Sequence, residues 1–135
     1  MAVPPPVFST ITIVRREMDE TSVTTATTVR AFNDAFNSHD IDAVMALMTD
    51  DCVFENTFPA PDGSRHVGAT NVRVALGDFL ASSSSARFEE EELIACQDRC
   101  IVRWRYSWGD GHVRGVDVMR VRDGKVSEKF AYVKG

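Results

Sequence analysis

The sequence has neither a long apolar run nor a strongly basic segment. No stretch approaches the roughly 18–20 apolar residues of a transmembrane helix, so the sequence predicts no membrane partner. A net charge of −5 at pH 7 argues against nucleic acid as a partner. Cysteine is also scarce. The chain has three, an odd number without a disulfide-rich pattern, and reduced thiols in a cytoplasmic protein are expected. The spacing of Cys96 and Cys100 does not match a paired zinc site, so no metal is predicted.

The chain of 135 residues is long enough for one domain with a core around a small pocket. The run Pro4-Pro5-Pro6 breaks regular structure, and the periodic pattern begins only after Met18. We therefore expect residues 1–20 to form a flexible extension, with Met18 as an alternative start, and residues 21–135 to form a single domain.

Apolar spacing predicts three helices, and alternation with turn signals predicts five strands. The helices are expected over 24–38, from Ile41 to about Met48 with Asp40 as the N-cap, and from Thr70 to about Ala81. The strands are expected over 52–57, 87–95, 99–108, 112–122 and 125–134. This order predicts an α+β fold with helices packed on one face of a curved, mostly antiparallel sheet.

Asp117 is a carboxylate on an otherwise apolar strand face, which it shares with Val113, Gly115, Met119 and Val121 by alternation. Burying an acid is costly unless the acid is paired, hydrogen-bonded or neutral. Asp117 is therefore a candidate catalytic group, and the alternative is a structural Asp satisfied by the backbone or by a lysine.

The partner of Asp117 on the last strand depends on the turn at Asp123-Gly124. A two-residue turn places Phe130 opposite Asp117, whereas a type I turn with Gly124 in a bulge places Lys129 there. In the second case Lys129 and Asp117 form an ion pair in or near the pocket.

Two further features are candidates for a site. Alternation puts Trp104, Tyr106 and Trp108 on one face with Val102, as an aromatic pocket wall or as core. His66 follows the Pro-Asp-Gly turn and is a second catalytic candidate, because histidine transfers protons near neutral pH.

The element order, with DDCVFEN in the first strand and RGVDVMRVRDGKVSEKFAYVKG at the end, resembles the superfamily of nuclear transport factor two, ketosteroid isomerase and the SnoaL-like cyclases. The resemblance implies a cone with three N-terminal helices on the concave face of the sheet. The tyrosine and general base of the isomerase correspond to Phe32 and Asn56, and only its third acid remains, as Asp117. The isomerase mechanism is therefore not expected.

The resemblance implies a pocket for a small apolar or polycyclic molecule. The mixed apolar and cationic outer face of the sheet, with Ile101 among arginines, predicts a homodimer. The expected binding residues are Phe32, Phe54, Asn56, Trp104, Tyr106, Trp108, Lys129 and Val133. We expect an isomerase, cyclase or hydrolase that needs no cofactor; the alternative is a non-catalytic ligand-binding or assembly domain.

Overall fold

Three helices and six strands follow one another in the computed structural model, which describes residues 19–135. In chain order they are α2 (Glu20–Asn37), α3 (Ile41–Ala46), β1 (Met48–Asn56), β2 (Ser64–Val67), α4 (Ala69–Ser82), β3 (Arg87–Cys96), β4 (Arg99–Trp108), β5 (Gly111–Arg122) and β6 (Lys125–Val133). The predicted extension and the alternative start at Met18 lie outside the described residues, except that Glu20 already begins α2.

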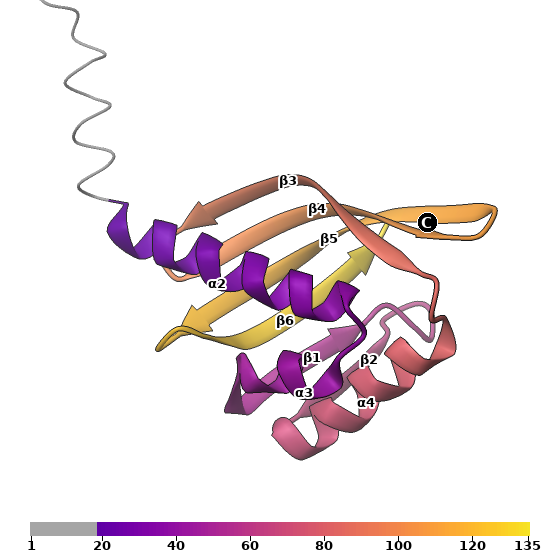
Figure 1. The fold of residues 1–135 in the computed structure, drawn as a ribbon, viewed down its shortest axis with the longest axis horizontal. Helices are drawn as coiled ribbons and strands as arrows, with labels where there is room; N and C mark the ends of the chain where they lie inside the picture. The colour runs from indigo at the N-terminus through magenta and orange to yellow at the C-terminus, as the bar shows by residue number, and fades with distance from the viewer. Residues whose placement is uncertain (1–18) are drawn as a thin grey trace, which may run out of the picture.

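The six strands form one curved sheet in the order β2-β1-β6-β5-β4-β3. All neighbours are antiparallel except β1 and β6, which are parallel. Figure 1 shows α2 across β3 to β6, with α3 and α4 beside β1 and β2 on the same side. The predicted α+β cone, with its helices on one face of the sheet, is confirmed.

Helix α2 is fixed over β3 at both of its ends. Near its start, Ser22 Oγ accepts the N–H of Gln97 at 2.8 Å, and Thr25 Oγ1 donates to the Gln97 carbonyl at 2.7 Å. At its end, Asn37 bonds both backbone groups of Phe88, at 2.8 and 2.9 Å. These long-range bonds satisfy polar groups that packing would otherwise leave unpaired, so they hold the helix at a set distance from the sheet.

The core lies between the helices and the concave face of the sheet. The spacing of apolar residues in α2 puts Val29, Phe32 and Phe36 on this side, all of them buried. They pack with Val44 of α3, Val72 and Leu76 of α4, and residues of the sheet such as Phe54, Val102 and Met119. Asp40 caps α3 as predicted, since its Oδ1 accepts the N–H of Ala43 at 3.1 Å. No helix among residues 19–135 is both long and apolar enough to cross a membrane.

Strand β2 is the one element that the sequence pattern missed. Its four residues include only one apolar side chain, Val67, and follow the proline-rich turn that ends at Gly63. Gly63 adopts φ +77°, and a Cβ there would lie 1.9 Å from the carbonyl oxygen of Asn56. This tight turn therefore needs glycine at position 63. The turn brings β2 alongside β1, and the pairing of the two strands begins with Ser64 opposite Asn56.

Candidate functional site

A buried ion pair lies at the centre of the concave face. Lys129 Nζ on β6 is 2.6 Å from Asp117 Oδ2 on β5. Asp117 is 4% exposed and Lys129 is 6% exposed, so both charges are withdrawn from bulk water. The direction predicted for Asp117, into the cone, is confirmed.

The strand register that produces this pair differs from both registers considered for the sequence. The turn has two residues, with Asp123 at φ +54° and Gly124 at φ +72°, and it pairs Arg122 with Lys125. The register then shifts by one residue between Arg120 and Val121. The residue opposite Asp117 is therefore Ala131, and the prediction of Phe130 or Lys129 in that position is wrong.

The register shift is a β-bulge at Ser127, because Arg120 pairs with Glu128 while Val121 pairs with Val126. Ser127 Oγ donates to the Arg120 carbonyl at 3.3 Å. The extra residue changes the side to which all later residues of β6 point. Lys129 then lies opposite Met119 and diagonally to Asp117 on the inner face, within reach of the carboxylate.

Aromatic rings form a continuous wall from the ion pair to the end of the sheet. Phe88 lies edge-on to Trp104 at 5.1 Å between ring centroids and 4.5 Å from Tyr106, and Tyr106 is 5.7 Å from Trp108. Gly115 is the cross-strand neighbour of Trp104, and a Cβ on it would lie 2.4 Å from the indole ring. The wall therefore depends on glycine at this position, since only hydrogen leaves room for the indole.

An apolar cavity of about 210 Å³ opens along this wall and reaches the ion pair. Of the predicted site residues, the lining includes Asp117, Lys129, Phe54, Asn56, Trp104, Tyr106, Trp108 and Val133. The other lining residues are Phe36, Thr57, Phe58, Phe79, Phe88, Val113 and Ala131. The structure thus brings eight of the ten predicted site residues to one cavity. Asn56 Oδ1 accepts the N–H of Thr57 at 2.8 Å, which fixes the orientation of its amide.

Phe32 and His66 lie outside the lining of this cavity. Phe32 is fully buried below the ion pair, with Lys129 Nζ 5.8 Å from its ring centroid. The ring of His66 stacks on Phe54 at 5.9 Å, and its Nε2 lies 3.1 Å from Ser64 Oγ. His66 instead lines a shallow surface depression beside α4.

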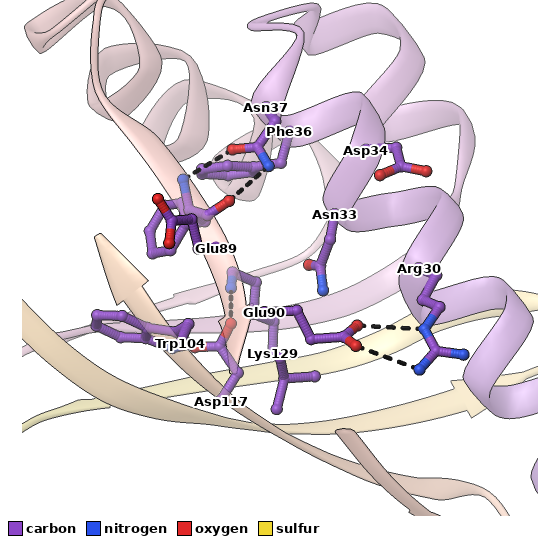
Figure 2. A pocket seen from close by; sticks show the side chains of 12 residues that line it. Arg30, Asn33, Asp34, Phe36, Asn37, Glu89, Glu90, Trp104, Asp117 and Lys129 are labelled. Carbon is purple, nitrogen blue, oxygen red and sulfur yellow. Dashed lines mark hydrogen bonds and ion pairs between the residues drawn. The ribbon is translucent and has the colours of Figure 1, made fainter. Parts of the chain in front are cut away.

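A second, polar cavity of about 120 Å³ reaches the same ion pair from between α2 and β3. It shares Asp117, Lys129 and Trp104 with the apolar cavity. Figure 2 shows Asn33 of α2 directed toward the pair, and the ion pair of Arg30 with Glu90 beside it at 3.2 Å. The sequence interpretation missed this side of the site.

The signal for the polar cavity was present in the helix itself. Arg30, Asn33 and Asn37 recur at spacings of three and four residues, which puts them on one side of α2. They border the apolar stripe of Val29, Phe32 and Phe36, so they mark the edge at which the helix meets the sheet.

Burial sets the protonation of the neutral groups near the pair. It raises the pKa of the Tyr106 phenol above its ordinary value, so this group keeps its proton and can donate a hydrogen bond. Burial, with a smaller contribution from Glu90, raises the pKa of the Cys100 thiol to about 11. Trp104 Nε1 is a buried donor that has no hydrogen-bond partner within residues 19–135.

This arrangement offers a carboxylate that can accept a proton and an ammonium that can stabilise negative charge on a neighbouring oxygen. Tyr106 adds a neutral donor on the cavity wall. The other walls are apolar and aromatic, so they favour a ligand with a flat apolar body.

Comparison with known proteins identifies relatives of the same architecture. The model of the SnoaL-like domain matches residues 29–129. An NTF2-like protein of unknown function from Mesorhizobium loti is 45% identical in sequence. Its alignment covers 87% of this chain and 96% of that one, with a TM-score of 0.77.

More distant structures support the fold alone. A putative ketosteroid isomerase from Kribbella flavida is 21% identical, with 84% of this chain and 80% of that one covered and a TM-score of 0.71. A putative polyketide cyclase from Sinorhizobium meliloti is also 21% identical, with 78% and 93% covered and a TM-score of 0.68. A search of curated proteins gives no match. The domain match over residues 29–129 and the 45% identity to an NTF2-like protein show that the chain belongs to the family of SnoaL-like domains.

Proposed function

We propose that this protein is a cofactor-independent enzyme of the isomerase, cyclase or hydrolase type that acts on a small, mostly apolar molecule. The observation that carries the proposal is the buried pair of Asp117 and Lys129 at the meeting point of two cavities. A buried ion pair is weak evidence for a stabilising role, because hydrophobic residues in its place are often neutral or stabilising. Ionisable groups buried in a cleft are instead typical of functional sites.

In this proposal Asp117 is the base and Lys129 is the electrophilic group. The carboxylate takes a proton from a carbon or a water held in the apolar cavity. The ammonium donates a hydrogen bond to the substrate oxygen on which negative charge develops. Tyr106 lies on the same wall and can donate a second hydrogen bond.

The size of the cavity supports a small substrate. About 210 Å³ is below the roughly 300–1,000 Å³ of common ligand sites, so a single-ring or short-chain molecule fits better than a polycyclic one. One structural neighbour is described as a putative ketosteroid isomerase and another as a putative polyketide cyclase. The pairing of Asp117 with Lys129 supports a different use of the acid from that in ketosteroid isomerase, which employs a neutral carboxylic acid as a donor.

The test begins with native mass spectrometry of freshly purified protein, to identify a bound metabolite. Turnover of that metabolite is then compared between the wild type, Asp117→Asn and Asp50→Asn. Asp50 is an exposed acid on β1 and provides a matched control. We expect Asp117→Asn to lower kcat by roughly 10²–10⁴-fold, the usual contribution of general acid–base catalysis, and Asp50→Asn to leave it unchanged. Full turnover by a folded Asp117→Asn variant would refute the role of this residue.

The alternative is a non-catalytic ligand-binding domain. It is supported by the position of Asn56, where the isomerase has its base, and by the position of His66 outside the cavity. This alternative predicts a metabolite that binds in the cavity and is never converted, with binding that weakens in the Asp117→Asn variant.

We also propose that the protein is a cytoplasmic homodimer. Its three cysteines are free, which is consistent with a reducing compartment. The outer face of the sheet exposes Ile94, Ile101 and Tyr132 by 50%, 40% and 54%. Arg103 forms an ion pair with Glu92 at 3.2 Å beside these three side chains. The outer face therefore has an apolar patch with charged residues next to it, a composition that is common in self-complementary dimer interfaces.

A further inference from the structure

Lysine is rare in this chain, and one of its few lysines occupies the centre of the candidate site. Of the fifteen basic residues, twelve are arginine and three are lysine. Lys125 and Lys134 are exposed, whereas Lys129 is 6% exposed and lines both cavities. Every other ion pair found among residues 19–135 uses arginine as the cation.

The choice of lysine at this position has a chemical meaning. Arginine suits a buried pair with a carboxylate better, because its planar guanidinium binds both oxygens. Its guanidinium, however, keeps its proton in proteins and is no nucleophile. Lysine can lose its proton when buried, and a desolvated amine attacks carbonyl carbon.

The surroundings of Lys129 Nζ fit such a role. Asp117 Oδ2 at 2.6 Å is close enough to exchange a proton with it directly. The ring centroids of Phe32 and Phe36 lie 5.8 and 5.6 Å from Nζ, so the amine is held between an acid and two apolar surfaces. The apolar cavity gives a small molecule a path to the nitrogen.

We propose that Lys129 forms a covalent imine with the carbonyl carbon of a small aldehyde or ketone bound in the apolar cavity. This inference rests on the proposed function of the cavity as a small-molecule site, and it names carbonyl compounds as the substrate class.

The reaction balances with the two residues and the ligand alone. The ammonium of Lys129 passes one proton to Asp117, which leaves a neutral amine and a neutral carboxylic acid. The amine nitrogen forms a bond to the carbonyl carbon, and the proton shed by nitrogen and the one held on Asp117 convert the carbonyl oxygen to water. The C=O bond is replaced by C=N, and the remaining hydrogen on nitrogen makes a protonated imine. Asp117 is again a carboxylate, so the charge of the pair is unchanged.

The protonated imine extends the chemistry open to Asp117. Positive charge on the nitrogen withdraws electrons through the C=N bond, which makes a hydrogen on the α carbon next to the imine carbon easier to remove than in the free carbonyl compound. Asp117 lies beside that nitrogen and is placed to accept the proton. Isomerisation, dehydration and ring closure next to a carbonyl group all begin with this step.

The experiment is reductive trapping with benzaldehyde and sodium cyanoborohydride near neutral pH, followed by peptide mapping. Reduction of an imine leaves one benzyl group on the lysine concerned. The exposed Lys125 and Lys134 are internal controls in the same molecule. We expect Lys129 to be labelled about tenfold faster than either of them, because the cavity holds the aldehyde beside the amine.

Three variants define the outcome. Lys129→Arg keeps the cation but removes the nucleophile, and it should lose the fast label while still binding benzaldehyde. Asp117→Asn removes the proton acceptor and should slow labelling of Lys129. A Lys125→Arg/Lys134→Arg double variant should leave that rate unchanged.

A binding measurement separates this inference from the proposed function. Binding of benzaldehyde is measured as quenching of the fluorescence of Trp104 and Trp108. Saturable quenching without faster labelling of Lys129 in the wild type would overturn the imine and leave the small-molecule site standing. The absence of quenching by benzaldehyde or by any metabolite recovered from the protein would overturn both. The wild-type comparison with Lys125 and Lys134 holds even where the Lys129→Arg variant fails to fold.

Discussion

Removing one member of the buried ion pair should destabilise the fold far more than removing both. In Lys129→Met the carboxylate of Asp117 loses its partner at 2.6 Å and remains in a site that is almost closed to water. In Asp117→Asn the ammonium of Lys129 is left in the same way. We expect each single substitution to lower the free energy of unfolding by about 3–5 kcal/mol, the usual consequence of an uncompensated buried charge.

The double variant Asp117→Asn/Lys129→Met contains no buried charge. Because the desolvation of both ions is then avoided, its free energy of unfolding should lie within about 1–2 kcal/mol of the wild-type value. The coupling energy of the cycle should therefore be several kcal/mol, far above the roughly 0.3–0.5 kcal/mol within which independent sites add. Against a total stability of about 5–15 kcal/mol, such differences are measurable.

Urea unfolding of the four proteins, followed by tryptophan fluorescence, gives these values. The fluorescence arises from Trp104 and Trp108 on the wall of the site. The reasoning would be refuted if each single substitution lowered the free energy of unfolding by less than about 1 kcal/mol and the two decreases summed to that of the double variant. Solvent-exposed ion pairs behave in that way.

Three further predictions concern other parts of the molecule. Burial raises the pKa of Cys100 from 9.0 to about 11, so the neutral thiol stabilises the fold below pH 9 and this contribution is lost as the pH rises toward 11. Urea unfolding should show a loss of about 2 kcal/mol over that interval in the wild type that is missing in Cys100→Ala, and identical alkaline profiles would contradict the assignment. Gly115→Ala should displace the indole of Trp104 and shift its fluorescence, because a Cβ there would lie 2.4 Å from the ring; an unchanged spectrum and stability would count against the packing described. Ile101→Glu on the outer face should give a monomer in analytical ultracentrifugation while the wild type is a dimer, with Asp50→Asn as the control that stays dimeric; a monomeric wild type at micromolar concentration would end the proposal of a homodimer.

The sequence predicted most of the fold because its patterns are local. Helices α2, α3 and α4 follow from apolar spacing, and the cap at Asp40 is a signal within four residues. Alternation along β5 was sufficient to place Asp117 on the inner face. Strand β2 was missed because four residues with one apolar side chain carry no period, and only its pairing with β1 makes it a strand.

The site was harder to predict because it depends on register and on the position of a helix. Nothing in the composition of β6 marks Ser127 as a bulge, so the residue facing Asp117 could not be derived from the turn alone. The polar cavity exists because Asn37 fixes α2 to Phe88, a contact between residues far apart in the sequence. His66 was placed near the pocket by its position after a turn. It pairs with Phe54 and stacks on it, so its ring lies on the same side of the sheet, but it borders the depression beside α4 and does not line the cavity.

The bulge at Ser127 has a consequence for how such a site can diverge during evolution. Deleting this one residue would make the pairing regular and would leave Glu128 opposite Arg120 and Lys129 opposite Met119, so the cation would stay on the inner face. If Ser127 instead entered the ladder opposite Arg120, Glu128 and Phe130 would take the inner positions and Lys129 would turn to the outer face. The cation beside Asp117 therefore depends on Ser127 being left out of the strand pairing. Substitutions near Ser127 that change this pairing can change the chemistry of the cavity while the fold around it is kept.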